Sequence, residues 1–551
     1  MRESRVPQTQ VPRISSGTPH LDQILCGGWL RGGIYIVSGP PGTGKTTLAN
    51  QLGFAVGERG EQAVYVTMAA ETHARMMLHL ESLAFFRRDL VGTHVHYLSG
   101  AATLKESGLP GLLDLLRRAV RERNARTLVI DGFEVVREKA ASKTEVREFL
   151  QALSAFASLI ECTSFLLSTT ETSKATDVEF AVVDGILALS ADLLGLKATR
   201  GMEVLKFRGS NILPGKHTFV IDERGFRVFP RWESCYRHTS ERVTDVGERL
   251  GFGLPSLDEM CHGGLLRFSS TLLMGSPGGG KTLLGMCLLA EGARQGEPGL
   301  YLGFAENAEQ ILLRASGVGL DLRGHVERGM LRLETRAPVE TLPDELVQQL
   351  MEMIDQRHYK RLFIDGLEPF ANEAIDPERI TRFVAALFNA LRDRGVTALV
   401  TQQTNDLFGP QLHAPIRGIE AICDNVMFLR FFEMGGRLCR VISVLKMRDS
   451  ANDPFLRELR ITSRGIDVGG TFAEVEASLT GQPRARPGAS AAARAQPPAP
   501  QAPAEQASKK AARSTKRSPE KGARSTKKPP KKAAGSTDKA SKNVARSRRG
   551  R

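Results

Sequence analysis

The sequence predicts an α/β protein: two tandem P-loop domains, each with a central and mostly parallel sheet, followed by a disordered C-terminal tail. Two observations carry this prediction. A phosphate-binding motif occurs twice, and the segments around both copies recur in the same order. Short apolar runs alternate with longer helical patterns, which is typical of parallel sheets covered by helices. At 551 residues the chain can hold two large cores and extensions.

Both copies of the motif match G-x-x-x-x-G-K-[ST], at residues 39–46 and 275–282. Glycines let backbone N–H groups surround a phosphate, the lysine reaches the β- and γ-phosphates, and the last threonine can bind Mg²⁺. A strand pattern precedes each motif and a helix start follows it, so a helix N-terminus points at the phosphates. We therefore predict nucleotide contacts from Gly39, Gly42, Thr43, Gly44, Lys45, Thr46 and Thr47, and from Gly275, Gly278, Gly279, Gly280, Lys281, Thr282 and Leu283.

The duplication extends well beyond the two loops. Matching segments precede and follow them, and the offset between equivalent residues stays within 234 to 240. The pattern indicates two homologous domains rather than a short-period solenoid. We expect an N-terminal arm at residues 1–11, a first domain at 12–235, a linker at 236–242, a second domain at 243–472 and a tail at 473–551.

Asp131 and Asp365 each end an apolar strand pattern and precede a glycine. This is the Walker B position, where a carboxylate helps to hold Mg²⁺. We predict that Asp131 binds the metal together with Thr46, and Asp365 together with Thr282. The alternative is an aspartate that only begins a turn.

Glu71 and Glu306 follow the second predicted strands, 26 and 25 residues after their P-loop lysines. A carboxylate there can orient or deprotonate the water that attacks the γ-phosphate. The alternative is a glutamate in the first turn of a helix, where the helix dipole favours it.

Two Lys-x-Arg pairs, Lys206/Arg208 and Lys446/Arg448, lie in strand-like segments. Alternation puts both cations of a pair on one face, which must meet solvent or a ligand. One hypothesis is that they act on the γ-phosphate held by a neighbouring subunit, as an arginine finger does.

Charge is concentrated in the tail. Residues 481–551 hold 20 lysines and arginines against three acids, a net charge of +17, so the rest of a chain of +14 is near −3. Few large apolar residues occur there, which predicts disorder. This segment either binds DNA or RNA phosphates, binds an acidic protein, or acts as a solvated tether.

The location predicted from the sequence is the cytoplasm. No apolar run has the length of a membrane span, the start lacks a signal-peptide pattern, and the seven cysteines have no metal-binding spacing. We expect no membrane contact.

Together these motifs resemble the KaiC family, the two-domain RecA-type ATPases of the bacterial clock and their non-clock relatives. The resemblance covers about residues 12–470 and includes Ser16–Asp22, both P-loops, Leu205–Ser210 and Phe219–Pro230. It implies two RecA-like domains that bind ATP and Mg²⁺, and a homo-hexameric double ring with ATP between subunits. It also favours the action of both Lys-x-Arg pairs across subunit interfaces.

Three departures from the family pattern concern the chemistry. The family typically has two adjacent glutamates at the catalytic strand end, whereas here the pairs read Ala70-Glu71 and Glu306-Asn307. Clock members autophosphorylate an adjacent Ser-Thr, but the matching stretch, Ile419–Asp424, has neither hydroxyl. Asp449 replaces a glycine after Arg448 and could pair with that arginine.

The sequence thus predicts an ATP-hydrolysing ring that acts as a conformational switch for an unidentified partner protein. Three alternatives stay open. The chain could be a serine/threonine kinase of the KaiC type, a nucleic-acid motor with a binding tail, or a scaffold that binds ATP without turnover.

Overall fold

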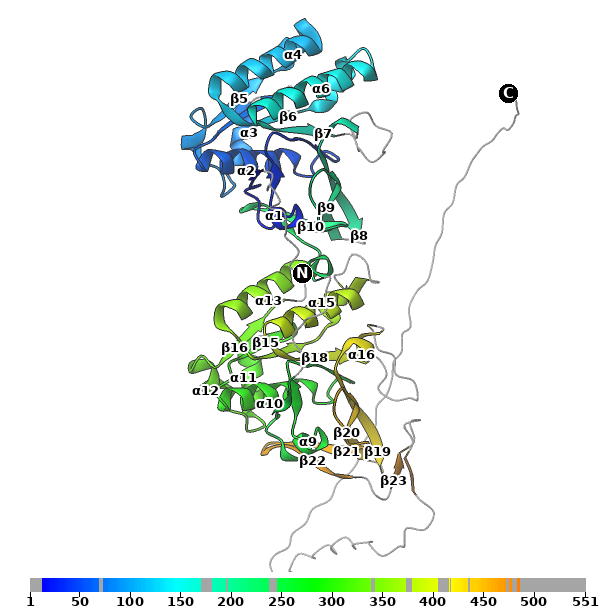
Figure 1. The fold of residues 1–551 in the computed structure, drawn as a ribbon. Helices are drawn as coiled ribbons and strands as arrows, with labels where there is room; N and C mark the ends of the chain where they lie inside the picture. Colours follow the sequence, from blue (N-terminus) through cyan, green and yellow to red (C-terminus); the bar gives the residue numbers. More distant parts are fainter. Residues whose placement is uncertain are drawn as a thin grey trace, which may run out of the picture. The chain divides into compact units, whose positions relative to one another are not determined.

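The computed structural model describes residues 12–68, 73–169, 181–194, 197–236, 245–337, 342–372, 379–404, 416, 418–434, 437–471, 475–477 and 483–485 (Figure 1). Glu71 and Ala70, the predicted arm, residues 237–242 of the predicted linker and most of the predicted tail lie outside these residues.

The first repeat is built on a nine-stranded sheet of order β11-β10-β9-β8-β3-β7-β6-β4-β5. Strands β8, β3, β7, β6, β4 and β5 run parallel, and β8 to β11 are joined by antiparallel pairs. The bounds are β3 (Ile34–Ser38), β4 (Gln62–Thr67), β5 (Val95–Ser99), β6 (Ala125–Asp131), β7 (Thr163–Ser168), β8 (Gly185–Leu194), β9 (Lys197–Phe207), β10 (His217–Asp222) and β11 (Gly225–Phe229).

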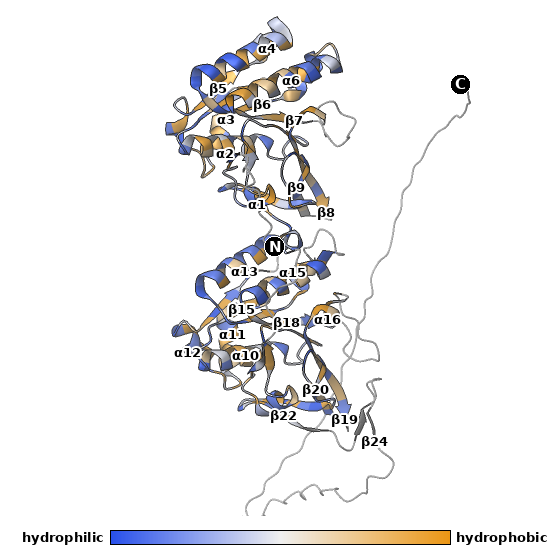
Figure 2. Cartoon of the chain, in the orientation of Figure 1, coloured by the Kyte–Doolittle hydropathy of each residue, from blue (hydrophilic) through white to orange (hydrophobic). Residues whose placement is uncertain are grey.

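Helices cover both faces of this sheet. Helix α2 (Lys45–Glu58) lies on one face, and α4 (Ala101–Arg123) and α6 (Lys143–Ile160) lie on the other (Figure 1). Alternate residues of β3 divide between two cores: Tyr35 and Val37 pack on the α2 side, Ile34 and Ile36 on the α4 and α6 side. Along α4 and α6 hydrophobic and hydrophilic residues are mixed, because only one face of each helix is buried (Figure 2). The smaller elements are β1 (Arg13–Ile14), α1 (Leu21–Ile24), β2 (Trp29–Leu30), α3 (His73–Leu80), α5 (Phe133–Lys139) and the short 3₁₀ helix Arg88–Leu90.

The second repeat has a nine-stranded sheet of order β16-β15-β17-β18-β14-β19-β20-β21-β22, which repeats the topology of the first. Its core strands are parallel as well. The bounds are β14 (Ser270–Gly275), β15 (Gly299–Gly303), β16 (Leu331–Thr335), β17 (Arg361–Asp365), β18 (Thr397–Gln403), β19 (Asn425–Met434), β20 (Arg437–Met447), β21 (Arg457–Thr462) and β22 (Gly465–Thr471).

Helix α10 (Lys281–Arg294) packs on one face of this second sheet, and α13 (Pro343–Arg357) and α15 (Ile380–Asp393) pack on the other. Other elements are β12 (Asp245–Leu250), α9 (Pro255–Met260), β13 (Leu265–Arg267), α11 (Ala308–Ser316), α12 (Leu322–Glu327), α14 (Glu368–Asn372) and α16 (Ile419–Ile422). Strands β23 (Val475–Ala477) and β24 (Pro483–Ala485) pair within the segment predicted as tail. Two mostly parallel sheets with helices on both faces confirm the predicted fold class.

The short helix α8 (Trp232–Cys235) contacts the second repeat. Trp232 belongs to the core formed by α13 and α15, and its backbone N–H donates to Asp344 at 3.0 Å. Arg379 joins Glu233 and Asp344, with its guanidinium 2.9 Å and 2.6 Å from their carboxylates. The end of the first repeat is therefore anchored by burial and by ion pairs.

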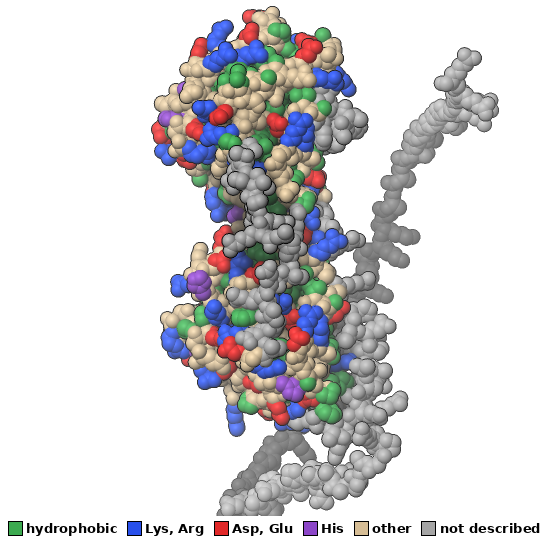
Figure 3. All heavy atoms as spheres, viewed as in Figure 1, with side chains coloured by type: hydrophobic (Ala, Val, Ile, Leu, Met, Phe, Trp, Pro, Cys, Tyr) green, Lys and Arg blue, Asp and Glu red, His purple; other side chains and the backbone are tan. Residues whose placement is uncertain are grey.

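Among the described helices, none combines the length and the apolar character that crossing a membrane requires. On the face shown in Figure 3, basic and acidic side chains of the described residues are interspersed. This agrees with the near-neutral charge of the chain outside the tail.

His217 is a buried neutral imidazole that makes folding sensitive to acid. Its Nδ1 accepts from the backbone N–H of Arg231 at 2.9 Å, and its Nε2 lies 3.0 Å from the carbonyl of Leu213. Burial, the largest cause, lowers the pKa of His217 from 6.5 to about 4. The unfolded chain therefore binds a proton first as the pH falls.

We expect the free energy of unfolding of the first repeat to fall by about 2 kcal/mol between pH 7.5 and pH 5, and to stay level above about pH 7. Trp29 and Trp232 are the two tryptophans of the chain. Urea unfolding followed by Trp29 fluorescence in a Trp232→Phe background would measure the change. His217→Gln should flatten the profile, and an unchanged profile in this variant would contradict the assignment.

Candidate functional site

Both P-loops adopt the geometry that their glycines require. Gly39 and Gly275 approach the neighbouring strand so closely that a Cβ would lie 2.3 Å and 2.4 Å from the carbonyl oxygens of Leu189 and Leu429. Gly44 and Gly280, which cap α2 and α10, have φ of 95° and 107°, in the left-handed region. Loops of this geometry, each followed by a helix N-terminus, are suited to bind a phosphate.

The P-loop lysines fold over their own loops. Lys45 Nζ donates to the carbonyls of Gly39 and Pro40 at 2.7 and 2.9 Å, and Lys281 makes the matching bonds to Gly275 and Ser276 at the same distances. Burial lowers the pKa of both lysines, and nearby acids oppose this effect. A bound phosphate would give each lysine a negatively charged partner in place of the neutral carbonyls.

In each repeat the strand-end aspartate accepts a hydrogen bond from the P-loop threonine, the two residues proposed as metal ligands. Thr46 Oγ1 donates to Asp131 at 3.0 Å, and Thr282 Oγ1 donates to Asp365 at 2.8 Å. Tyr65 and Tyr301 donate to the same carboxylates. For Asp131 burial raises the pKa, while the bonds from Tyr65 and Thr46 lower it.

These oxygen donors fit Mg²⁺, which is held in such sites by one or two protein oxygens together with the phosphates. Thr46 with Asp131, and Thr282 with Asp365, would hold the ion. Within the described residues, no group of three or more His, Cys, Asp or Glu could form a metal site on its own.

Glu306 lies at the same edge of the second sheet. It precedes Asn307, which caps α11 in a capping box with Gln310, so Glu306 stands outside the first turn of the helix. Its Oε1 pairs with Arg314, while its Oε2 is buried and has no hydrogen-bond partner. An oxygen of this kind is suited to accept from a water molecule. Glu71, the matching residue of the first repeat, lies outside the described residues.

The Lys-x-Arg pairs lie away from the P-loop of their own repeat. Arg208 pairs with Asp184, 3.6 Å away, and Asp184 accepts from the N–H of Ile34, the first residue of β3. Arg448 pairs with Asp424 at 3.2 Å, beside Ser270, the first residue of β14. Both P-loops follow the opposite ends of these strands, so each arginine lies at the far edge of its sheet.

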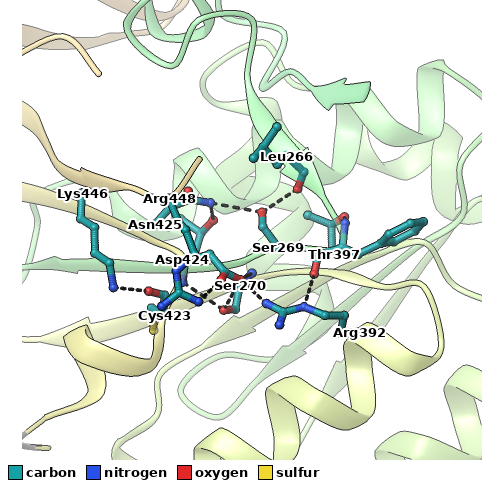
Figure 4. Close-up of polar contacts among 12 residues, drawn as sticks. Leu266, Ser269, Ser270, Arg392, Thr397, Cys423, Asp424, Asn425, Lys446 and Arg448 are labelled. Atoms are coloured by element: carbon teal, nitrogen blue, oxygen red, sulfur yellow. Dashed lines mark hydrogen bonds and ion pairs between the residues drawn. The ribbon is translucent and has the colours of Figure 1, made fainter. Parts of the chain in front are cut away.

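Lys446 and Arg448 make polar contacts around buried Asp424 and the end of α16 (Figure 4). Lys446 Nζ donates to the carbonyls of Glu420, Ala421 and Cys423 at the end of α16, at 3.2, 3.2 and 2.7 Å. Arg392 and Arg448 are both directed at Asp424, which also accepts from the N–H and hydroxyl of Ser270. In the first repeat, burial lowers the pKa of Lys206, and the charge of Arg208 adds to this.

Asp449 is unusual in its backbone conformation, and it is not the ion-pair partner of Arg448. Its φ is 57°, and the matching Gly209 has a φ of 68°. A left-handed aspartate is strained where glycine is not. Arg448 pairs with Asp424 instead of Asp449. Residues Ile419–Ile422, which precede Asp424, form α16.

The sequence reasoning missed several side chains near the P-loops. Arg314 and Arg440 line a cavity of about 420 Å³ around the second P-loop, together with Ile461. Arg440 Nε also donates to Gly278 at 3.0 Å. Glu134 and Glu368 follow the strand-end aspartates by three residues, and their charges partly oppose the lowering of the lysine pKa by burial. The signal for these two acids was the Asp-Gly-x-Glu pattern present in both repeats.

Comparison with known proteins agrees with this geometry. The model of the KaiC ATPase family matches residues 14–233 and 250–471. The circadian clock oscillator protein KaiC 1 of Synechocystis sp. is 27% identical over 492 residues, which cover 87% of this chain and 93% of that protein. The circadian clock oscillator protein KaiC of Picosynechococcus sp. is 27% identical over 487 residues, or 86% and 92% of the two chains.

We expect Asp424→Ala to destabilise the second repeat by about 3 kcal/mol, because it leaves Arg392 and the Ser270 N–H without their shared acceptor. Asp184→Ala is the matched variant of the first repeat and should cost about 1 kcal/mol, since half-exposed Arg208 can turn to water. Scanning calorimetry of the full chain would compare them. Equal losses would contradict a special role for the Arg392–Asp424–Arg448 cluster.

Proposed function

Because the chain belongs to the KaiC ATPase family, we propose that it is an ATP-hydrolysing homo-oligomeric ring, and that it acts as a conformational switch for a partner protein. The observation that carries the proposal is the same in both repeats: the P-loop lysine bonds to carbonyls of its own loop, and the P-loop threonine donates to the strand-end aspartate. A scaffold that binds Mg²⁺–ATP without turnover would use the same residues, and what favours hydrolysis is Glu306, whose buried Oε2 has no hydrogen-bond partner and can accept from a water.

The chemistry assigned to each site is ATP hydrolysis. A water oxygen attacks the γ-phosphorus, the bond to the β-phosphate oxygen breaks, and ADP, phosphate and a proton result. Mg²⁺ bound at Thr46/Asp131 or Thr282/Asp365 would neutralise phosphate charge. Lys45 or Lys281 leaves its loop carbonyls to contact the phosphates, and Glu71 or Glu306 orients the water. In the second site, Arg314 holds one oxygen of Glu306 and leaves the other for this water.

We propose a ring because each Lys-x-Arg pair lies at the edge of its sheet that is opposite to the P-loop, too far from the nucleotide of its own repeat to contact it. Arg208 and Arg448 stand level with the first residue of the P-loop strand, and the loop itself follows the last. An arginine there can act on a nucleotide only when a second subunit supplies it. A hexamer with ATP between subunits satisfies this requirement, with Lys206/Arg208 and Lys446/Arg448 acting in trans.

Kinase activity of the clock type is the weaker hypothesis. Glu420 and Ala421 occupy the acceptor positions, and neither has a hydroxyl that could take a phosphoryl group. Another serine or threonine would have to serve. Mass spectrometry of the protein after incubation with ATP would detect such a site.

The decisive experiment is ATP hydrolysis by the full chain, with the mass of the assembly measured in parallel. We expect the double variant Glu71→Gln/Glu306→Gln to lose at least about 100-fold in turnover with nucleotide binding retained. The single variants identify the working ring. Glu309→Gln, an exposed acid on α11, is the control. Lys206→Ala/Arg208→Ala and Lys446→Ala/Arg448→Ala should also lose turnover without losing nucleotide.

A wild-type protein that binds ATP without hydrolysing it would overturn the enzyme assignment and favour a scaffold. Turnover by a stable monomer would overturn the trans assignment of the cations.

We also propose that residues 481–551 bind nucleic acid, because their net charge of +17 complements the negative charge of the phosphates. They contain no aromatic residue that could stack on a base. Binding should therefore be independent of sequence and carried by phosphates. The same tail supports the alternative of a nucleic-acid motor.

We expect the full chain to bind duplex DNA with an affinity that falls by roughly 10³-fold or more between 50 and 200 mM salt. Fluorescence anisotropy would measure this, with a chain ending at residue 480 as the control. Equal affinity of both chains would exclude the tail as the binding segment. DNA-stimulated ATP hydrolysis by the shortened chain would point to a motor instead.

A further inference from the structure

A second carboxylate follows the candidate magnesium ligand in each repeat. The strand end reads Asp131-Gly132-Phe133-Glu134 in the first repeat and Asp365-Gly366-Leu367-Glu368 in the second. Gly132 and Gly366 have φ of 96° and 108°, in the left-handed region, so the chain turns sharply before each glutamate. A Cβ on Gly366 would lie 3.1 Å from a carboxylate oxygen of Glu368, which shows that this side chain folds back toward the strand end.

Both carboxylates bond to the backbone of the neighbouring strand. Glu134 Oε2 accepts from the N–H of Thr169, directly after β7, at 3.3 Å. Glu368 Oε1 accepts from the N–H of Gln403, the last residue of β18, at 2.5 Å. In each sheet this strand lies between the strand of the P-loop and the strand of the metal-binding aspartate.

The middle strand is in turn bonded to the P-loop. The N–H of Gly39 donates to the carbonyl of Ser168 at 3.1 Å, and the N–H of Thr404 donates to the carbonyl of Gly275 at 3.1 Å. Three adjacent strand ends are therefore connected by hydrogen bonds at the nucleotide edge. The glutamate contributes a side chain to this connection at the same position in both repeats. Its charge also lies close enough to oppose the lowered pKa of Lys45 or Lys281.

An alternative explanation is that each glutamate stands in the first turn of a helix merely because the helix dipole favours a negative charge there. That explanation does not account for the bond across to another strand. It also does not account for the same bond in two repeats whose flanking residues differ, Val135 against Pro369 for example.

We propose that Glu134 and Glu368 are positioning residues for ATP hydrolysis: each holds the end of the middle strand between the P-loop and the metal-binding aspartate. The proposal rests on hydrolysis at these two sites. The glutamates act through the backbone of Thr169 and Gln403, so the rate of the chemical step depends on them and the affinity for nucleotide does not. Misplacement of a catalytic edge by about 1 Å can cost on the order of 100-fold in rate.

The test compares two double variants of the full chain, Glu134→Ala/Glu368→Ala and Glu134→Gln/Glu368→Gln. Alanine removes the acceptor, and we expect kcat to fall at least about ten-fold, with KM and the Kd for a non-hydrolysable Mg²⁺–ATP analogue within about two-fold. Glutamine keeps an acceptor oxygen for the N–H, and we expect kcat within about three-fold of wild type. Glu138→Gln, an exposed acid on α5, is the control.

Three results would overturn the proposal. The first is an alanine variant with wild-type kcat. The second is an alanine variant that loses nucleotide affinity and thermal stability together with kcat, which indicates general damage. The third is a glutamine variant as slow as the alanine variant, which indicates a need for charge rather than position. Absence of turnover in the wild type would overturn the proposed function first, and this inference with it, whereas normal turnover in the variants overturns this inference alone.

Discussion

One hydrogen bond in each repeat fixes the arrangement on which the rest of the site depends: the bond from the P-loop threonine to the strand-end aspartate. It joins the first turn of α2 or α10 to a strand two positions away in the sheet. Parallel pairing makes this possible, because the carboxyl ends of all three strands meet at one edge. Asp131 is largely buried there, and the hydroxyls of Thr46 and Tyr65 compensate for its desolvation.

Much of this arrangement could be predicted from the sequence because it is local or repeated. The P-loops combine strand, glycines and helix within a few residues, and the nearly constant offset places an aspartate at the end of the matching strand in both repeats. Contacts between distant segments could not be predicted in this way. The Arg448–Asp424 pair depends on the register of β19 against β20, and the Arg392–Asp424 pair depends on how α15 packs beside the start of β19. A single sequence specifies neither. The sequence therefore suggests Asp449, adjacent to Arg448, as the partner, whereas the structure pairs this arginine with Asp424.

The two repeats keep one topology but fill it differently. Arg361 is fully buried at the start of β17, where its guanidinium bonds to Glu297, Gln295 and two carbonyls. Gly292 on α10 makes room for it, since a Cβ there would lie 2.5 Å from Arg361. The matching residues of the first repeat are the smaller Thr127 and the larger Val56, both buried. A large residue on the strand is matched by a small one on the helix in the second repeat, and the reverse holds in the first, as close packing requires. The arrangement of the P-loop, threonine and aspartate is the same in both repeats.

Helix α8 belongs to the first repeat by sequence but packs on the second repeat in the structure, so the boundary of the duplicated sequence differs from the boundary of the folded core. Trp232 and Glu233 belong by sequence to the first copy, yet one fills the core of the second copy and the other completes its Arg379–Asp344 ion pair. A gene fragment cut at the sequence boundary would leave an apolar hole and a partly compensated guanidinium in the second copy. A second copy on its own would therefore keep its complete core and this ion pair only if it began before Trp232.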